Sequence, residues 1–511
     1  MVAPSEGTPG TAAEGSSADA VGSLSRTLRW GATVSGAGLI IVQTVALVQT
    51  LVLARLLSPA EVGVFAAGTV LTVLLTEFAQ GSLNQALIQR RQNVDDAADT
   101  VFWVTLANGV IASLAALALA PVVGRVFDNP VVGVVAATTS GIMLLHAVTT
   151  VPDALMHRRF QFSRRVIVDP AVAVTFAIVA ITLAALGYGV WSLVIGYYAS
   201  MGTWILASWW LCGWRPGRGR FSIRIWREMA VFAFPLLLDG VVTRVRDAVE
   251  LMLIGHRLTD SAIGNYRYGR RIAMFPGLAI VQICSCVLFP AFSRIAEDPL
   301  RFRQAFLRAL GWVWVAAMPM AAVLAAVGEP LTVVLLGEPW RTAGVALVAM
   351  SGFGLGEAMN SVSAESMKGA GRADRINWMI VAGLLSGIPL LVLLLPFGLA
   401  GVGLAISVSA VVVGVTGLVL ARPIVGVSFA DITRRMLPPT IASLLAYALI
   451  APLEHFVMHS DQLPTAVGLG VIALEGLGFL VVYLGALRVV APTTTAEIGQ
   501  AITRALRRSA R

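Results

Sequence analysis

LLLDGVVTRVRDAVELMLIG, residues 236 to 255, lies inside a long apolar run and carries five charged side chains: Asp239, Arg244, Arg246, Asp247 and Glu250. Insertion into the middle of a membrane costs about 2.5 to 3.5 kcal/mol for an Asp or Arg, so five charges would cost up to about 12 to 17 kcal/mol. The thirteen Leu, Ile, Val and Phe residues between 229 and 255 would return only roughly 4 to 8 kcal/mol. Such a helix is not stable against lipid, and its charges are therefore expected to face the interior of a helical bundle or a wet cavity.

The spacing of these charges agrees with one polar stripe on a helix. At about 100° per residue, Asp239, Arg246, Asp247 and Glu250 fall on one side, whereas Arg244 leaves the stripe. One interpretation is a self-neutralising ladder within the helix, in which Arg246 pairs with Glu250 and Arg244 with Asp247. The other is a functional site, because ionisable groups inside a membrane usually mark a substrate or ion pathway.

Composition indicates a polytopic membrane protein. The 511 residues are 57% hydrophobic and 13% charged, against roughly 25% charged residues in soluble domains. The net charge of +9 lies almost entirely in short connectors, so nucleic acid is not expected as a partner. The three cysteines lie in apolar segments, which favours packing over a metal site or disulfides.

Apolar stretches of about 20 residues predict an all-α fold with about fourteen transmembrane helices. With the N-terminus inside, 28 Lys and Arg residues fall in inner connectors and tails and five in outer connectors. This bias places both termini in the cytoplasm, for a chain expected in the plasma (inner) membrane. The predicted spans are 31–54, 61–80, 100–123, 131–152, 166–186, 189–212, 229–254, 269–292, 309–328, 343–365, 377–396, 399–420, 436–453 and 465–487.

An internal duplication organises these spans. The outer connectors RLLSPAEVGVF (55–65) and HRLTDSAIGNY (256–266) match at an offset of 201 residues, and glycine-rich hairpins at 187 and 398 match at an offset of 211. Two six-helix bundles related by a pseudo-two-fold axis around a central cavity are expected, plus two C-terminal helices. The predicted segments are a disordered cytoplasmic tail (1–28), an N-terminal bundle (29–212), a basic cytoplasmic connector (213–228), a C-terminal bundle (229–422), two additional helices (423–488) and a basic cytoplasmic tail (489–511).

Sequence signatures of several enzyme classes are missing. The single lysine, Lys368, lies in MKGAG, so no phosphate-binding loop of the G-x-x-x-x-G-K-[ST] type is present, and neither is an H-E-x-x-H zinc motif. The longest outer loop is the short EHFVMHSDQLP (454–464), which disfavours a membrane glycosyltransferase or polymerase. We therefore expect a protein that is not an enzyme, with no catalytic residues, no metal and no cofactor.

Four segments carry a resemblance to a known family: ARLLSPAEVGVFA (54–66), ALIQRR (86–91), GYGVWSLVIG (187–196) and the long stretch from YRYGRR to SRIAED (266–298). Over roughly residues 28 to 420 the chain resembles the Wzx-type polysaccharide and oligosaccharide flippases of the MOP superfamily, in the branch handling exopolysaccharide, lipopolysaccharide and teichuronic-acid precursors. The resemblance implies alternating access and movement of an undecaprenyl-diphosphate-linked oligosaccharide from the inner to the outer leaflet. It also implies a lipid bilayer setting, with a polysaccharide polymerase and glycosyltransferases as further partners.

The cavity argument, not the resemblance, selects the site residues. Arginine suits a diphosphate because its planar guanidinium donates paired hydrogen bonds and stays charged. The predicted substrate-binding residues are Arg244, Arg246, Arg267, Arg270 and Arg271, the last three from YRYGRR (266–271). The acidic residues are expected to position these arginines or to couple transport to H⁺ or Na⁺; they are Asp239, Asp247 and Glu250, with Glu77 and Glu357 as secondary cavity residues. A multidrug or cation antiporter of the same superfamily remains the alternative.

Overall fold

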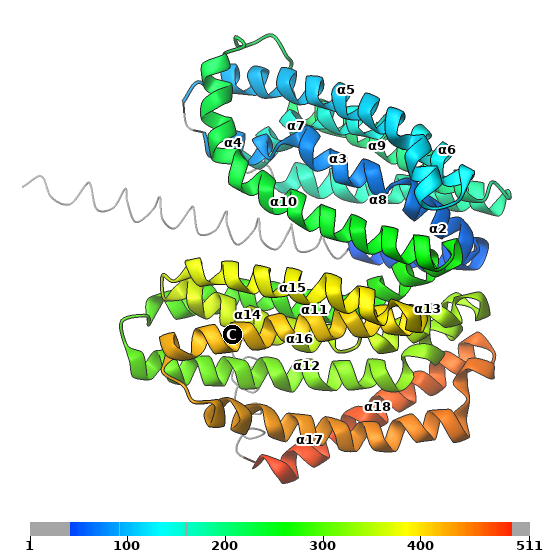
Figure 1. The fold of residues 1–511 in the computed structure, drawn as a ribbon, viewed down its shortest axis with the longest axis vertical. Helices are drawn as coiled ribbons and strands as arrows, with labels where there is room; N and C mark the ends of the chain where they lie inside the picture. The colour runs from blue at the N-terminus through cyan, green and yellow to red at the C-terminus, as the bar shows by residue number, and fades with distance from the viewer. Residues whose placement is uncertain (1–40, 91, 159–161, 493–511) are drawn as a thin grey trace, which may run out of the picture. The chain divides into compact units, whose positions relative to one another are not determined.

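The structure is a computed structural model that describes residues 41–90, 92–158 and 162–492, and these residues form helices and no strand (Figure 1). The predicted tail 1–28 and most of the predicted tail 489–511 lie outside the described residues. The helices are α2 (Pro59–Gly68), α3 (Val70–Gln80), α4 (Leu83–Gln89), α5 (Val94–Val126), α6 (Pro130–Thr139), α7 (Ile142–Arg158), α8 (Phe162–Ala185), α9 (Val190–Cys212), α10 (Ile223–Arg257), α11 (Asp260–Arg294), α12 (Pro299–Leu336), α13 (Arg341–Ala349), α14 (Phe353–Gly369), α15 (Ile376–Leu394), α16 (Gly398–Val425), α17 (Phe429–Leu453) and α18 (Thr465–Val490). Short turns η1 (Glu338–Trp340), η2 (Ala373–Arg375), η3 (Leu395–Phe397), η4 (Glu454–Met458) and η5 (Ser460–Gln462) connect some of them.

The all-helical, membrane-spanning character of the chain is confirmed. Within the described residues, eleven segments are long and apolar enough to cross a membrane, and 41–56 forms a shorter apolar helix. One of the eleven, 373–425, contains both α15 and α16. Helix α10 is not among these eleven segments, because its charged side chains interrupt every apolar stretch of the length needed to cross a membrane. The total of fourteen spans and the two six-helix bundles stay predictions.

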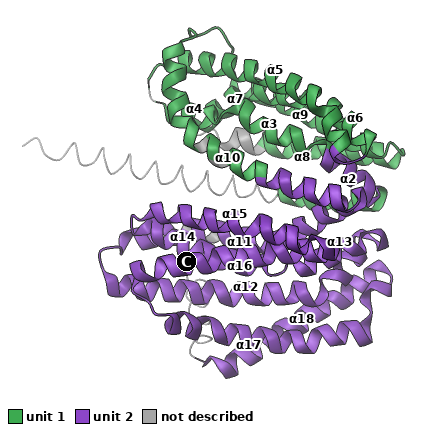
Figure 2. Cartoon of the chain, in the orientation of Figure 1, with its two compact units in different colours: residues 1–56, 68–125, 129–245 green, residues 57–67, 126–128, 246–511 purple. Residues whose placement is uncertain are grey.

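The chain divides into two compact units (Figure 2). Unit 1 comprises residues 1–56, 68–125 and 129–245, and unit 2 comprises 57–67, 126–128 and 246–511. Helix α10 therefore begins in unit 1 and ends in unit 2. In unit 1, α7 packs against α3, α4 and α9, and α8 packs along α9.

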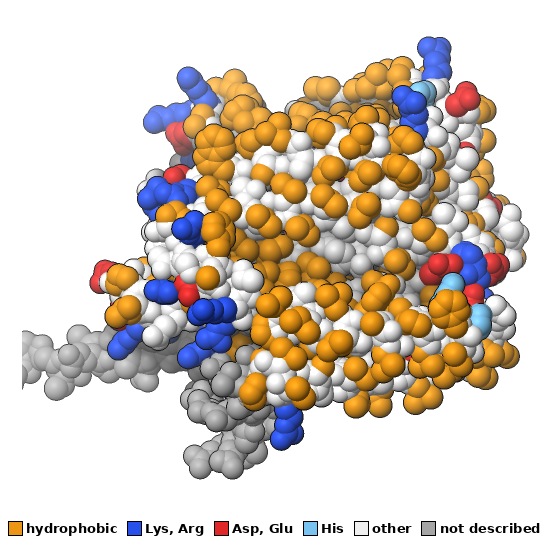
Figure 3. All heavy atoms as spheres, turned by 60° about the horizontal axis from the view of Figure 1, so that its bottom comes forward, with side chains coloured by type: hydrophobic (Ala, Val, Ile, Leu, Met, Phe, Trp, Pro, Cys, Tyr) orange, Lys and Arg blue, Asp and Glu red, His pale blue; other side chains and the backbone are white. Residues whose placement is uncertain are grey.

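Unit 2 is built around α12 and α14. Helix α14 packs against α11 and α16, and α12 packs against α13, α17 and α18 (Figure 1). One hydrophobic core lies among α11, α12, α14 and α16, and a second joins α12 to α17 and α18. On the face of the molecule seen in Figure 3, hydrophobic side chains cover the broad middle and charged side chains gather toward the two ends of the helices. This distribution is what a bilayer requires of the helix surfaces that face it.

The two connector segments that match in the sequence both reach into unit 2, and in each of them a helix begins there at the same relative position. Ser58 and Glu61 cap α2, and at the same offset of 201 residues Thr259 caps α11 by accepting a hydrogen bond from the backbone N–H of Ala262. A Cβ added to Gly63 would lie 1.8 Å from the carbonyl oxygen of Asp260, and one added to Gly264 would lie 1.9 Å from the carbonyl oxygen of Pro59. The matched glycines thus allow the two helices to touch backbone to backbone.

The two glycine-rich hairpins also fall where the sequence predicts them. Helix α8 ends at Ala185 and α9 begins at Val190, with Gly187 at φ +84° and Gly189 at φ +54°. In the second case Gly398 has φ +67° and begins α16. Positive φ is accessible to glycine without a steric penalty, so these residues end one helix and begin the next within a few positions.

The predicted basic connector is fastened to the start of α5 in unit 1. The buried carboxylate of Asp99 accepts hydrogen bonds from the backbone N–H groups of Gly217 and Gly219, at distances down to 2.6 Å. Asp96 accepts a further hydrogen bond from the backbone N–H of Arg220. Arg90 in turn pairs with Glu228 at 3.2 Å, which ties the end of α4 to the first turns of α10. The connector therefore has a fixed conformation.

Candidate functional site: an arginine and carboxylate cluster on α10 and α11

Arg270 is the centre of a charged cluster in unit 2. Its Nη2 lies 3.2 Å from Oδ1 of Asp247, and its Nη1 lies 3.5 Å from Oε1 of Glu250. Nη1 also donates a 2.9 Å hydrogen bond to the hydroxyl of Tyr266, one helical turn earlier on α11. The guanidinium is thus oriented from two helices, α10 and α11, before any ligand arrives.

Arg246 lies beside this centre and is more accessible. Its Nη2 is 3.7 Å from Oδ1 of Asp247, and 46% of its side chain is exposed, against 24% for Arg270. Glu357 on α14 lies within electrostatic range of Arg246 and accepts a 3.2 Å hydrogen bond from the amide of Asn360. The shared carboxylate of Asp247 joins the two arginines.

Arg244 belongs to unit 1 and has a different partner. Its Nε donates a 3.1 Å hydrogen bond to Oε1 of Glu77 on α3. The same glutamate reaches α10 at Gly240, where an added Cβ would lie 3.0 Å from Oε2 of Glu77. Two residues selected from the sequence for different reasons are thus brought together within one unit.

Arg267 and Arg271 flank Tyr268 on α11, and both side chains are exposed. The guanidinium of Arg267 also lies 5.9 Å from the ring centre of Phe65 on α2, a cation–π distance. All three arginines of α11 therefore have aromatic neighbours, and Arg270 contacts carboxylates as well. The side chain of Asp239 lies outside the described part of the chain, so its predicted role stays a prediction.

The pairing differs from a ladder within one helix. Arg244 reaches Glu77 on α3, and Asp247 and Glu250 reach Arg270 on α11. The intrahelical alternative assumed that partners lie three or four residues apart, but the structure places a neighbouring helix closer to these groups. The charges therefore join helices, as expected for ionisable groups in a bundle interior.

Tyr266, which completes the cluster, was missed in the sequence, whereas Asn360 is a weaker polar candidate beside Glu357 in the predicted span 343–365. Tyr266 precedes Arg270 by four residues and Asn360 follows Glu357 by three, spacings that place side chains on one helix face. In YRYGRR (266–271), the four-residue spacing between Tyr266 and Arg270 could have indicated that the tyrosine contacts the arginine.

The cluster can bind an anion only by competing with its own carboxylates. Two guanidinium groups, from Arg246 and Arg270, face three carboxylates, from Asp247, Glu250 and Glu357. Within the described residues no group of three or more His, Cys, Asp or Glu side chains is placed to hold a metal ion. The cluster can therefore exchange ion pairs. An arginine would leave its carboxylate to bind an anionic ligand, and that carboxylate could then bind a cation.

Long apolar helices that carry charges paired across helices define a multi-pass membrane protein. The fold is similar to that of the lipid II flippase MurJ in its inward closed conformation, with a TM-score of 0.71, 16% identity and coverage of 89% of this chain and 98% of that chain. A multidrug resistance MATE family transporter of the MOP superfamily, in its inward-facing conformation, is similar with a TM-score of 0.61, 15% identity and coverage of 75% of this chain and 94% of that chain. These likenesses show that the chain shares the fold of these two proteins.

The chain belongs to the polysaccharide biosynthesis protein family, whose match covers residues 52–344. It is 26% identical to the succinoglycan biosynthesis transport protein ExoT of Rhizobium meliloti (strain 1021), over 57% of this chain and 59% of that protein. It is 23% identical to the lipopolysaccharide biosynthesis protein WzxC of Escherichia coli (strain K12), over 61% of this chain and 64% of that protein. The chain thus spans about three fifths of the length of these relatives. The resemblance seen in the sequence is confirmed at the level of the family.

Proposed function

We propose that this protein is a flippase that moves a lipid-linked oligosaccharide, joined to its polyprenyl carrier by a diphosphate, across the plasma membrane by alternating access. The family membership and the MOP-superfamily fold support transport of a polysaccharide precursor. The observation that carries the proposal is the pair formed by the oriented Arg270 and the accessible Arg246, which share Asp247.

The ion pairs suggest how the diphosphate is bound and released. Arg246 binds the phosphate first, because more of its side chain is exposed and its contact with Asp247 is long at 3.7 Å. Arg270 follows when its own carboxylates are neutralised by H⁺ or Na⁺, which makes binding depend on an ion gradient. Arg244, Arg267 and Arg271 act as further anion contacts, and Glu77 holds Arg244 until the substrate arrives.

Replacing Arg246 or Arg270 tests the assignment directly. We expect Arg246→Ala and Arg270→Ala to lower export by about 10- to 100-fold, because a hydrogen bond to a charged group is worth about 1.5 to 3 kcal/mol. Export is measured as surface polysaccharide in a strain lacking the gene, and as flipping of a fluorescent diphosphate-linked oligosaccharide in proteoliposomes. Arg224→Ala is the control, since Arg224 lies on the same helix with 90% of its side chain exposed. Normal export by both cluster variants at normal membrane abundance would contradict the proposal.

The excess of carboxylates keeps a cation antiporter as the second candidate. Asp247, Glu250 and Glu357 together outnumber the two guanidinium groups and would suit a cationic drug. This function predicts drug sensitivity on gene deletion and dependence on the carboxylates, with Arg246→Ala active. Synthesis of glycan by the purified protein would instead point to an enzyme. Co-purification with a polymerase or glycosyltransferase tests the proposed partners separately.

A further inference from the structure

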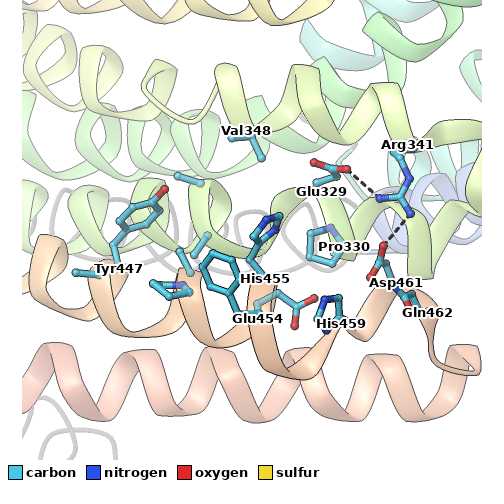
Figure 4. Close-up of a pocket in the computed structure, with 16 residues that line it drawn as sticks. Glu329, Pro330, Arg341, Val348, Tyr447, Glu454, His455, His459, Asp461 and Gln462 are labelled. Carbon is cyan, nitrogen blue, oxygen red and sulfur yellow. Dashed lines mark hydrogen bonds and ion pairs between the residues drawn. The ribbon is translucent and has the colours of Figure 1, made fainter.

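Unit 2 contains a second polar site, a pocket whose lining does not include the residues of the cluster around Arg270. The pocket has a volume of about 790 Å³ and lies between α12, the start of α13 and the turns η4 and η5 that join α17 to α18 (Figure 4). The sequence places this connection on the outer side of the membrane. Its lining includes Glu329, Arg341, Tyr447, Glu454, His455 and Asp461.

Arg341 forms one rim of the pocket and is fully occupied by carboxylates. It pairs with Glu329 at 2.9 Å, Glu338 at 2.7 Å and Asp461 at 2.7 Å. Figure 4 shows Glu329 and Asp461 reaching this guanidinium from two different directions, each along a dashed line. Arg341 is therefore not available to neutralise the remaining carboxylate of the lining, Glu454.

Glu454 is buried and only half satisfied. Its Oε1 accepts hydrogen bonds from the backbone N–H of Ser460 at 3.0 Å and from the Ser460 hydroxyl at 2.6 Å. Its Oε2 is buried and has no hydrogen-bond partner among the described residues. Glu454 begins η4, a turn of π-helix at the end of α17, and such turns often occur at functional sites.

The second carboxyl group belongs to Glu475, a buried residue near the middle of α18. It occupies the inward stripe of that helix between Ile472 and Phe479, and it is 4% exposed. Both of its carboxyl oxygens are buried without a hydrogen-bond partner among the described residues. Helix α18 packs against α17, which runs directly into η4 at Glu454, and the carboxyl groups of Glu475 and Glu454 are neighbours.

Two ionised carboxylates cannot satisfy this arrangement. A carboxylate only accepts hydrogen bonds, so a charged pair would leave three buried oxygens without a donor and would place two negative charges side by side. One added proton turns one carboxyl into a donor and removes the repulsion. We propose that Glu454 and Glu475 form a proton-binding site, in which one proton is shared between Oε2 of Glu454 and a carboxyl oxygen of Glu475 and is exchanged through the pocket.

The residues around Glu454 and Glu475 favour neutralisation of one carboxylate by a proton. The alternative, an ion pair with a basic side chain, would need a basic group that is not already paired. The basic group of the lining, Arg341, is held by three other carboxylates. The remaining charged or titratable groups of the lining come from α12, α17, η4, η5 and the residue between the two turns; they are Glu329, Tyr447, His455, His459 and Asp461. The two histidines line the same pocket as Glu454, and an imidazole there can relay a proton to water.

Infrared spectroscopy of the purified full-length protein in nanodiscs tests the site. At neutral pH we expect a C=O stretching band of a protonated carboxylic acid that shifts in D₂O. Glu475→Gln and Glu454→Gln should each remove that band, because either change leaves the other carboxyl without a shared proton. Glu329→Gln is the matched control from the same pocket, and it should leave the band unchanged because Glu329 is paired with Arg341.

Three results would overturn the proposal. The first is a wild-type spectrum without the band, which decides the matter even if a variant does not fold. The second is a band that persists unchanged in both Gln variants. The third is a band that disappears when Na⁺ replaces K⁺, which would make the pair a sodium site. None of these measurements requires transport, so the proposed proton site and the proposed flippase function are tested separately.

Discussion

Tyr266 shows how a neutral side chain can control a charged one. Its hydroxyl accepts a hydrogen bond from Nη1 of Arg270 at 2.9 Å, while Asp247 and Glu250 hold the same guanidinium from α10. Tyr266 itself is 3% exposed, so this hydrogen bond is shielded from water. The tyrosine therefore fixes the direction of Arg270 without adding charge to the cluster.

Removing that hydroxyl should weaken export and spare folding. We expect Tyr266→Phe to lower flipping about fivefold, the factor that corresponds to a hydrogen bond of about 1 kcal/mol. The measurement is the proteoliposome assay at several substrate concentrations, and the apparent KM should rise because a less oriented Arg270 binds phosphate less well. Tyr188→Phe, an exposed tyrosine in the α8–α9 hairpin, should match the wild type. An unchanged KM in Tyr266→Phe would remove the tyrosine from the site.

The residues of the site were only partly predictable from sequence. The cost of burying charge identified Arg246, Asp247 and Glu250, because that cost depends on composition alone. The sequence also named Arg270 and Glu77, but it could not predict which charges they pair with, because Arg270 reaches Asp247 and Glu250 from α11 and Glu77 reaches Arg244 from α3. Glu475 was overlooked for the same reason: a single glutamate in an apolar span gives no sequence signal until its neighbour Glu454 is known.

At the scale of helices, the contact between α2 and α11 leaves no room for a side chain at two matched glycines. Gly63 and Gly264 each face a backbone carbonyl at under 2 Å from an added Cβ, and a backbone carbonyl cannot swing aside. Both glycines were matched by the sequence duplication, but their mutual contact was not foreseen. The two glycines that match in the sequence thus lie in the same helix–helix contact.

Alanine at either glycine should destabilise the protein. We expect Gly63→Ala and Gly264→Ala to lower the free energy of unfolding by about 1 to 3 kcal/mol or more, as overpacking does elsewhere. Gly470→Ala on α18 is the control, since an added Cβ there meets no atom within 4 Å and alanine favours the helix. Thermal unfolding followed by size-exclusion fluorescence in detergent gives the comparison. Equal melting temperatures for Gly63→Ala and Gly470→Ala would show that the two helices do not touch in the native protein.

Helix boundaries follow local chemistry more closely than apolar length. The predicted span 61–80 is divided, since α2 ends at Gly68 and α3 ends at Gln80 before Gly81 at φ +58°. The predicted span 343–365 is likewise divided between α13 and α14. Hydropathy, averaged over about 20 residues, does not detect such breaks. A turn at membrane depth is possible because neighbouring helices can supply hydrogen-bond partners for its free backbone groups.

For the whole molecule, topology is the expectation with the widest consequences. The charge bias places the connector 213–228 in the cytoplasm and the turn between α17 and α18 outside. Two exposed positions, Arg218 and Gln462, report on these sites. In a cysteine-free background, Gln462→Cys should react with a membrane-impermeant maleimide in intact cells, whereas Arg218→Cys should react only after permeabilisation. The reverse pattern would invert the topology and place the Glu454 and Glu475 pair on the cytoplasmic side.

Arg341 has a practical consequence for following this protein in motion. Because its guanidinium joins Glu329 on α12 to Asp461 between α17 and α18, the last two helices are anchored at that end to the body of unit 2. A fluorophore on the turn between α17 and α18 will therefore report displacements of α12 without altering any helix that carries the charged cluster. The C-terminal pair offers a ready-made reporter arm for single-molecule measurements.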